Sequence, residues 1–260
     1  MKIALAQICT TDDVAANLEQ VAARAAEAAA HRAELVVFPE ATMCAFGHPL
    51  GGVAEPLDGP FARRVEQLGR EHQIHLVLGM FTPSQDGSRV RNTLLLAGPS
   101  GRFGYDKIHL YDAFSTTESR RVAPGERLVV VEALGIRIGL ATCYDVRFAD
   151  QFTALGRAGA QLVCLPASWG DGERKVEQWE LLVRARAMDA QAVLLACGQA
   201  AVDTGGRKAL GVGHSMVAGP LGEVLARADA DPELLVSSVD LDVVERAREA
   251  VPVLGGHSSR

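Results

Sequence analysis

The strongest constraint on the fold is a repeated alternation of short apolar segments with helical ones. Lys2 to Ile8 has the alternating pattern of a strand, and residues 17–31 (NLEQVAARAAEAAAH) consist largely of strong helix formers. A second apolar run, residues 34–38, is followed by the helical spacing of residues 60–72. Because strands and helices that alternate bury their apolar sides against one another in layers, the pattern predicts an α/β fold.

Turn sequences interrupt this alternation and predict hairpins. PSQDGS (83–88) and GPSG (98–101) separate strand-like segments, and Ala133 to Gly135 joins residues 129–131 to residues 136–141. Strands joined both by helices and by hairpins form mixed sheets, and so many strands require two of them. We therefore expect a four-layer α-β-β-α sandwich, with two mixed sheets inside and helices outside.

The chain has no feature that would divide it into separate cores. It contains no linker, no repeat of fixed length and no low-complexity tract, and its 260 residues are enough for one large hydrophobic core. We predict a single domain over residues 1–260, with a frayed tail over about residues 255–260.

Charge and hydropathy narrow the classes of partner. The formal net charge of −6 disfavours a broad phosphate-binding surface, so no nucleic-acid partner is expected. No apolar run approaches the ~20 residues that cross a bilayer, and no signal-peptide pattern develops at the start. We therefore expect a cytoplasmic protein with a small-molecule partner and no membrane partner.

Cysteine and histidine spacing does not predict a metal site. The five cysteines are odd in number, scattered and never paired as CxxC, and the seven histidines include no HExxH spacing. Neither a disulfide framework nor a bound metal is expected, and at least one thiol is free.

One cysteine lies where strand-to-helix turns present nucleophiles. In GLATCYDVRF (139–148) an apolar run typical of a buried strand stops just before Cys143, and a helical pattern begins at Phe148. A side chain at such an elbow is lifted out of the sheet, and the free N–H groups of the following turn face its target. A small buried apolar cysteine is the commoner explanation for any single cysteine. Cys143 is a candidate nucleophile whose partners must come from elsewhere.

Two other strand ends carry chemically useful groups. Glu40 follows the apolar run LVVFP (35–39), and Lys107 lies near the end of the strand-like segment RFGYDKIHL (102–110). Residues at the carboxyl ends of strands in an α/β fold tend to converge on a shared crevice. Taken alone, Glu40 could be a helix-capping glutamate, Lys107 a solvated lysine and Cys143 a packed cysteine. The combination of the three favours a catalytic site.

Five ordered motifs resemble those of the nitrilase superfamily of carbon–nitrogen hydrolases: FPEATM, YDKIHLYDAF, TESRRVAPG, CYDVRF and GHSMVAGPLGEVLA. The similarity runs from ALAQ (4–7) to SVDLDVV (238–244). Within the superfamily the chain is most similar to the Nit-type amidases, the group of ω-amidase and deaminated glutathione amidase, on the basis of CYDVRF, WELLVRARAMD and GHSMV. The resemblance implies a nitrilase-like fold that needs no metal or organic cofactor.

The resemblance also implies a Glu-Lys-Cys triad of Glu40, Lys107 and Cys143. Amide hydrolysis needs a strong nucleophile, stabilisation of an oxyanion and a proton for the departing ammonia. Cys143 would attack the amide and form a thioester intermediate, Glu40 would move the proton, and Lys107 with the backbone N–H of Tyr144 would hold the oxyanion. Glu118 of TESRRVAPG matches a second glutamate that supports the site in many superfamily members. Its simpler alternative role is to orient Lys107.

Substrate recognition is less constrained by these patterns. Arg147, four residues after the cysteine, could bind a substrate carboxylate bidentately, which would suit small ω-amides of dicarboxylic acids. A structural ion pair with Asp145 or Asp150 is an equal alternative for Arg147.

Three aromatic residues, Phe46, Tyr111 and Trp169, are candidate pocket walls, with core packing as the alternative for each. A nitrilase proper or an N-carbamoyl amino acid amidohydrolase would use the same triad. A non-catalytic binding protein could share the fold, although retention of all three triad residues argues against it. Superfamily members commonly pair through faces near the site, so we expect a homodimer or a higher homo-oligomer.

Overall fold

Two six-stranded mixed sheets form the centre of the molecule. The computed structural model describes the whole chain except residues 86, 115, 202–209 and 256–260. The first sheet has the order β14-β1-β2-β3-β4-β5, formed by Glu233–Ser238, Lys2–Gln7, Leu35–Val37, His75–Pro83, Val90–Gly98 and Gly101–Asp106. The second has the order β13-β12-β11-β10-β9-β8, formed by Val224–Arg227, Met216–Ala218, Val193–Gly198, Leu162–Ala167, Ile136–Leu140 and Val129–Ala133.

Each sheet is parallel in its middle and antiparallel toward its edges. Strands β1, β2 and β3 run parallel, as do β9, β10 and β11, and the remaining neighbours pair antiparallel. Parallel strands need crossover connections, which the helices supply, whereas two-residue turns join the antiparallel pairs β4–β5 and β8–β9. The mixed sheets predicted from the alternation of helices and hairpins are confirmed.

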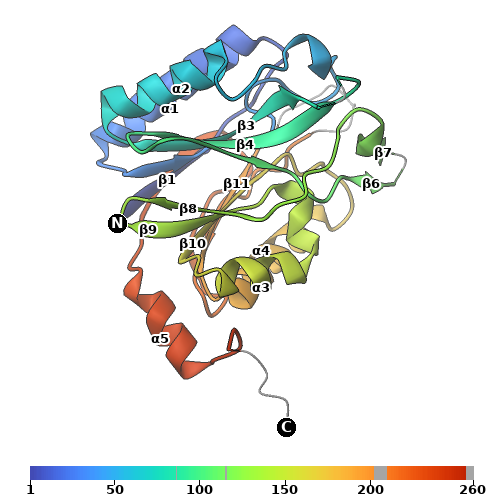
Figure 1. The fold of residues 1–260 in the computed structure, drawn as a ribbon. Coiled ribbons are helices and arrows are strands. Elements are labelled where there is room, and N and C mark those ends of the chain that lie inside the picture. The colour runs from blue at the N-terminus through green and yellow to red at the C-terminus, as the bar shows by residue number, and fades with distance from the viewer. Residues whose placement is uncertain (86, 115, 202–209, 256–260) are drawn as a thin grey trace.

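Helices cover the outer face of each sheet. Figure 1 shows α1 (Val14–Ala30) and α2 (Pro60–His72) on one side of the sandwich, and α3 (Ala149–Arg157) and α4 (Lys175–Ala190) on the other. The short α5 (Asp242–Ala250) follows β14 and extends away from the main body (Figure 1). This is the four-layer sandwich that the pattern of apolar segments predicts.

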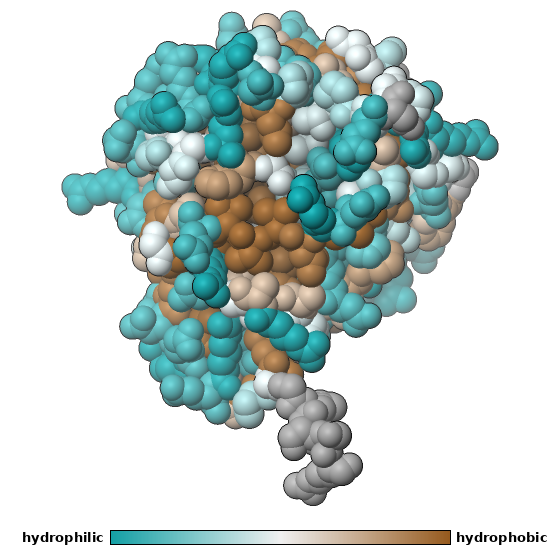
Figure 2. Space-filling view, in the orientation of Figure 1, coloured by the Kyte–Doolittle hydropathy of each residue, from teal (hydrophilic) through white to brown (hydrophobic). Residues whose placement is uncertain are grey.

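Three apolar layers hold the four structural layers together. One cluster, including Leu5 and Leu195, fills the space between the two sheets. A second, including Val21, joins α1 and α2 to the first sheet, and a third, including Trp179, joins α3 and α4 to the second sheet. Hydrophobic residues gather at the level of the sheets in the space-filling view, and the helix layers are largely hydrophilic (Figure 2). Burial of both sheet faces explains why the central strands lack a polar alternation.

Helix starts and the segment before β8 differ from the sequence predictions. Helix α1 begins at Val14 rather than at residue 17, because Asp13 accepts hydrogen bonds from the N–H groups of Ala15 (2.9 Å) and Ala16 (3.1 Å). The amphipathic pattern of residues 178–191 predicts a helix that starts at Gln178, whereas helix α4 begins three residues earlier, at Lys175. Boundaries depend on capping, which periodicity does not report.

Residues 111–127 are polar and lack a period, which predicts an unbroken loop, and this prediction is wrong. That segment contains the two-stranded β6 (Asp112–Ala113) and β7 (Thr116–Thr117) sheet and the 3-10 helix η2 (Glu118–Arg120). Strands of two residues are too short to produce a detectable period of two. The glycine-rich loop predicted over residues 204–213 and the frayed tail lie largely outside the described residues.

No helix in the described part of the chain is both long enough and apolar enough to cross a membrane.

Candidate active site

Glu40 is held at the carboxyl end of β2 by the neighbouring strand. Beyond Val37 the chain keeps bonding to β3, since the N–H of Gly79 donates to the carbonyl of Pro39 at 3.2 Å. A Cβ on Gly79 would lie 2.6 Å from the backbone nitrogen of Ala41, so the close approach of the two segments requires glycine there. The Glu40 side chain is 1 % exposed. Its carboxylate is therefore fixed in the interior, where it needs polar partners.

The carboxylate of Glu40 receives three hydrogen bonds from distant segments. Lys107 Nζ donates to Oε1 at 2.9 Å and Asn92 Nδ2 donates to the same oxygen at 2.8 Å. The backbone N–H of Ser168 donates to Oε2 at 2.9 Å. Donors from β4, from the end of β5 and from the end of β10 therefore set the orientation of this carboxylate.

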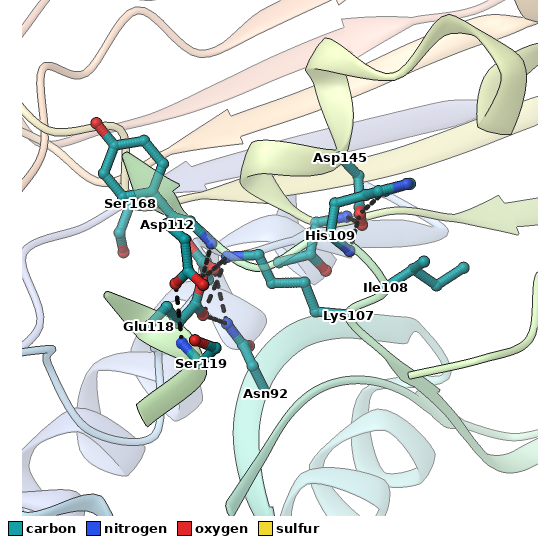
Figure 3. Close-up of polar contacts among 12 residues, drawn as sticks. Asn92, Lys107, Ile108, His109, Asp112, Glu118, Ser119, Asp145 and Ser168 are labelled. Carbon is teal, nitrogen blue, oxygen red and sulfur yellow. Dashed lines mark hydrogen bonds and ion pairs between the residues drawn. The ribbon is translucent and has the colours of Figure 1, made fainter. Parts of the chain in front are cut away.

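Lys107 immediately follows β5 and is buried among carboxylates. Its N–H donates to the carbonyl of Asn92 at 2.9 Å, and its Nζ contacts Glu40 at 2.9 Å and Glu118 Oε2 at 3.0 Å. Burial by itself would lower the pKa of the ammonium, but the carboxylates of Glu40 and Glu118 outweigh it and hold that pKa well above the usual range. Figure 3 shows the side chains of Lys107, Glu118 and Asn92 directed toward one another. Lys107 is therefore a fixed cation.

Glu118 begins the 3-10 helix η2 and completes this group. Besides the two contacts with Lys107 Nζ, at 3.0 and 3.2 Å, its carboxylate accepts hydrogen bonds from Asn92 Nδ2 at 3.3 Å and from the N–H of Tyr111 at 2.6 Å. An ammonium has three N–H donors. Glu40 and Glu118 occupy two directions around Lys107, which leaves the third for a ligand in the adjoining cavity.

Cys143 follows β9 on a strained turn. Its φ of +47° lies in the left-handed region, which non-glycine residues rarely adopt, and the 3-10 helix η3 (Cys143–Arg147) starts there. Such strain at a strand-to-helix turn lifts a nucleophile out of the sheet. Burial, followed by the nearby Glu40 carboxylate, raises the pKa of the thiol well above its usual range, against an opposing effect of Lys107. The Cys143 side chain is therefore a neutral thiol, which would have to lose its proton to act as a nucleophile.

The backbone N–H of Tyr144 belongs to the first turn of η3. N–H groups in the first turn of a helix have no acceptor within that helix, so they are available to bind an oxyanion. The ring of Tyr144 packs edge-on against Tyr111, with centroids 5.0 Å apart.

A cavity of about 500 Å³ opens beside these three strand ends. Glu40, Lys107 and Cys143 line it together, so the structure brings together all three strand-end residues. Phe46, Tyr111 and Trp169 also line this cavity, as do Glu118 and Tyr144. The indole Nε1 of Trp169 donates to the carbonyl of Lys175 at 2.9 Å, which fixes one wall.

Arg147 is not among the residues that line the cavity. Its Nη2 donates to Gln178 Oε1 at 2.8 Å, and its guanidinium lies over the ring of Trp169 at 5.0 Å. Within the described residues it has neither of the ion pairs considered from the sequence, with Asp145 or Asp150. The cations that line the cavity are instead Lys107, Lys175, Arg120 and Arg121.

Two residues that bond Glu40 carried no functional prediction. Asn92 bonds both Glu40 and Glu118, and the N–H of Ser168 bonds Glu40. The signal for Asn92 is its place in strand β4 close to the apolar residues 94–97, where a buried amide (1 % exposed) needs partners. Ser168 acts through its backbone, for which its residue type offers no signal. No group of three or more His, Cys, Asp or Glu side chains suited to a metal ion occurs among the residues that the structure describes.

Comparisons with known proteins identify the family of this chain. Residues 2–249 match the protein family described as carbon-nitrogen hydrolase. Hydrolase Rv0480c of Mycobacterium tuberculosis is 52% identical, covering 98% of this chain and 94% of its own length. Deaminated glutathione amidase of Escherichia coli O157:H7 is 32% identical, covering 98% and 96%. The crystal structure of Saccharomyces cerevisiae Nit3, from the nitrilase superfamily, superposes with a TM-score of 0.87 at 26% identity, covering 100% of this chain and 97% of that one.

Proposed function

Because the chain belongs to the carbon–nitrogen hydrolase family, we propose that it is a cysteine-dependent amidase that releases ammonia from a small amide. The observation that supports this most strongly is the convergence of Glu40, Lys107 and Cys143 on one cavity, with Glu40 and Lys107 in contact at 2.9 Å. A nucleophile, a proton carrier and a fixed cation are the groups that hydrolysis of an amide requires.

Acylation begins from the neutral thiol. Glu40 accepts the proton of Cys143 as the sulfur attacks the amide carbon, so the charge of the carboxylate passes to the substrate oxygen. The third N–H of Lys107 and the backbone N–H of Tyr144 bind that oxyanion, and each contact of this kind is worth roughly 3 to 4 kcal/mol. Glu40 then gives the proton to the amide nitrogen. The carbon–nitrogen bond breaks, ammonia leaves, and the acyl group stays on Cys143 as a thioester.

Deacylation uses the same groups in reverse order. Glu40, again a carboxylate, takes a proton from water as the water oxygen attacks the thioester carbon. The oxyanion is bound as before, the carbon–sulfur bond breaks, and Glu40 returns the proton to the sulfur of Cys143. The three hydrogen bonds to Glu40 from Lys107, Asn92 and Ser168 hold the carboxylate in place through both halves of the cycle.

The substrate that we propose carries a carboxylate besides its amide. Lys175, Arg120 and Arg121 line the cavity, in a protein whose formal net charge is −6. A local excess of cations in an acidic protein favours an anionic ligand. The relative named deaminated glutathione amidase and the relatives named omega-amidase NIT2 support the same substrate class.

A panel of substrates tests this function. Ammonia release would be measured from ω-amides of dicarboxylic acids, neutral amides, nitriles and N-carbamoyl amino acids, and intact mass would be recorded after rapid quenching. We expect turnover of the anionic amides and an acyl adduct on Cys143 whose mass identifies the acyl group. Preference for nitriles or carbamoyl compounds would assign one of the alternative activities. Absence of turnover across the panel, together with a Cys143 that iodoacetamide does not label, would identify a binding protein.

We also propose that the protein is a homodimer or a higher homo-oligomer. Leu181 and Met188 on α4 are 65% and 51% exposed, and Leu221 in the β12–β13 turn is 53% exposed. Apolar side chains gathered on one surface commonly mark an interface. Sedimentation equilibrium should give at least twice the chain mass of 27.6 kDa. A monomer at micromolar concentration would contradict the proposal.

A further inference from the structure

We propose that Asp145 is a positioning residue: its carboxylate ties the turn that carries Cys143 to the segment that carries Lys107. This inference rests on the proposed amidase function. Asp145 is fully buried, yet it has no role in the chemical steps described above. Its two oxygens accept four hydrogen bonds, from donors on two segments that are far apart in the sequence. A buried carboxylate that is so completely bonded holds its donors in fixed relative positions.

One hydrogen bond restrains the nucleophile. The backbone N–H of Thr142, the residue before Cys143, donates to Asp145 Oδ2 at 2.9 Å. This contact closes the turn around Cys143, whose φ of +47° is unfavourable for a residue with a side chain. A strained conformation persists only where the surroundings impose it. Asp145 supplies one such restraint at the position that aims the thiol.

The other three hydrogen bonds restrain Lys107 from both sides. His109 donates to Asp145 Oδ1 from its backbone N–H at 3.0 Å and from its ring Nδ1 at 2.9 Å. The hydroxyl of Tyr105 donates to Oδ2 at 2.7 Å. Tyr105 and His109 stand two residues before and two residues after Lys107, so both flanks of the lysine are attached to the same carboxylate. Figure 3 shows the side chains of Asp145 and His109 directed toward each other, beside Lys107.

Further contacts stiffen this connection, which we term the Asp145 clamp and define as Asp145 with Tyr105, His109 and Thr142. The Tyr105 hydroxyl accepts hydrogen bonds from the N–H of Ile108 at 3.2 Å and from Gln151 Nε2 at 2.9 Å. The ring of His109 stacks on Phe148 with centroids 3.6 Å apart and planes inclined by 7°. The clamp therefore joins the first sheet, through β5, to η3 and α3 next to the second sheet.

This position gives the clamp a specific consequence for catalysis. Lys107 must bind the oxyanion that forms when Cys143 attacks, so the separation of these two residues determines how well the transition state is bound. A displacement of about 1 Å in a catalytic group can cost roughly 10²-fold in rate. Asp145 touches neither the substrate nor the reacting atoms in the proposed mechanism. Its loss should therefore lower kcat and leave substrate affinity nearly unchanged.

Three variants test the clamp. Asp145→Asn keeps the size of the side chain but places an amide NH₂ group where the carboxylate accepted hydrogen bonds from N–H and O–H donors. Tyr105→Phe removes one of these donors, the Tyr105 hydroxyl. Asp106→Asn is the matched control, because Asp106 precedes Lys107 on β5 but bonds Thr93 and Arg91 instead of the nucleophile turn. Each variant would be assayed well below its melting temperature, and rates would be normalised to the concentration of Cys143 that an acylating amide labels.

We expect Asp145→Asn to lower kcat by about 10²-fold with KM within about threefold, and Asp106→Asn to leave kcat within about twofold. Tyr105→Phe should lower kcat less, and the double variant should be no slower than Asp145→Asn alone, because both residues act through one clamp. An unchanged kcat in folded Asp145→Asn would overturn the proposal. So would a raised KM with normal kcat, or losses that multiply in the double variant.

A second readout separates failure of the clamp from failure of the amidase proposal. Alkylation of Cys143 by iodoacetamide needs a thiol placed beside Glu40 but no hydrolysis of an amide. We expect alkylation at pH 7 to be roughly tenfold slower in Asp145→Asn than in the wild type and unchanged in Asp106→Asn. If the wild type hydrolyses no amide but this difference in alkylation holds, the proposed function fails and the clamp stands. Equal alkylation rates in all three proteins contradict the clamp.

Discussion

At the scale of single residues, the site depends on a thiol that burial and Glu40 keep protonated. The pKa of Cys143 is raised, although a nucleophilic cysteine is often activated by a lowered pKa. In the proposed mechanism the sulfur therefore depends on Glu40 to remove its proton during attack. The ammonium of Lys107 at 2.9 Å and the N–H of Ser168 orient the Glu40 carboxylate for this role.

Replacement of the nucleophile should remove turnover without unfolding the protein. Cys143→Ala and Cys143→Ser should each lower kcat by roughly 10³-fold or more, because neither side chain forms the thioester efficiently. The near-ultraviolet circular dichroism spectrum should remain that of the wild type, since the hydrogen bonds between Thr142 and Asp145 that close the turn do not use the Cys143 side chain. Substantial residual turnover in either purified variant would rule out the thioester mechanism.

Removal of the proton carrier should block acylation itself. Glu40→Gln keeps the shape of the side chain but cannot accept the proton of Cys143, so we expect thioester formation to slow by about 10² to 10⁴-fold. Quenched-flow mass spectrometry would follow the adduct directly. Asn92→Asp is a useful companion variant, because it adds a negative charge beside Glu40 without removing the carboxylate. A normal rate of thioester formation in Glu40→Gln would refute the acid/base role of Glu40.

At the scale of elements, the site depends on how closely strand ends approach one another. Strands β2 and β3 run parallel, and the chain after β2 stays bonded to β3 through Phe38, Pro39 and Met43. Within this stretch Ala41 has a positive φ of +49°, immediately after Glu40. The direction of the Glu40 side chain is therefore a property of the packed strand pair as well as of its own segment.

Gly79→Ala should disturb this strand pair and with it catalysis. A Cβ there would lie 2.6 Å from the nitrogen of Ala41 and 2.9 Å from the carbonyl carbon of Glu40, so the backbone that carries the glutamate must move. We expect a loss of roughly 1 to 3 kcal/mol in the free energy of unfolding and at least about a tenfold fall in kcat.

Gly156→Ala is the control for that experiment. Its Cβ would meet the carbonyl oxygen of Ala190 at 2.3 Å, far from the cavity, so it should destabilise the protein while the remaining folded enzyme keeps a normal kcat. Urea titrations and kcat values per folded molecule would separate the two effects. Equal kcat values for the two variants would show that the close contact at Gly79 does not position Glu40.

At the scale of the whole molecule, the layers between sheets and helices enclose ionisable groups as well as apolar ones. Burial raises the pKa values of the Cys164 and Cys197 thiols far above their usual range. Burial and the nearby Asp145 carboxylate raise the pKa of the Tyr105 hydroxyl, and burial and the Glu40 carboxylate raise the pKa of the Cys143 thiol. These groups stay protonated in the folded protein at pH values where the unfolded chain would release their protons.

The protein should therefore lose stability at alkaline pH. Thiols in the unfolded chain titrate near pH 8.5, so the stability that the buried thiols contribute is complete below that pH. This contribution is lost as the pH rises from there toward the pKa values of the thiols in the folded protein. Above pH 8.5 the folded state binds more protons than the unfolded state. The free energy of unfolding should then fall by about 1.4 kcal/mol per pH unit for each thiol.

Urea unfolding at intervals between pH 8 and pH 10.5 would measure this slope, and the Cys164→Ala/Cys197→Ala variant is the control. With Cys164 and Cys197 absent, two of the four buried thiols are removed, so the slope should fall by the share of these two thiols, although the variant is less stable at every pH. A slope that is the same in both proteins would mean that other groups cause the alkaline loss of stability.

Much of this architecture is encoded locally in the chain. Apolar period and turn residues predict the strands, the helices and the places where strands end, because each depends on neighbouring residues only. The three strand-end residues Glu40, Lys107 and Cys143 could be selected in this way, and their convergence follows from the rule that strand ends share a crevice. Ordered motifs around the same residues lead to the same family that the full-length comparison identifies.

Other features depend on contacts that no local pattern encodes. Asn92 bonds Glu40 across 52 positions of sequence, Ser168 bonds it across 128, and Asp145 bonds His109 across 36. Which polar groups meet at such separations depends on strand register and on the stacking of the two sheets, and a shift of one residue would turn each side chain to the opposite face. Arg147 illustrates the same limit, because its neighbours in the folded protein are Gln178 and Trp169 rather than the cavity. Local sequence therefore determines which segments form and which residues end them, while packing of the two sheets determines which side chains meet in the site.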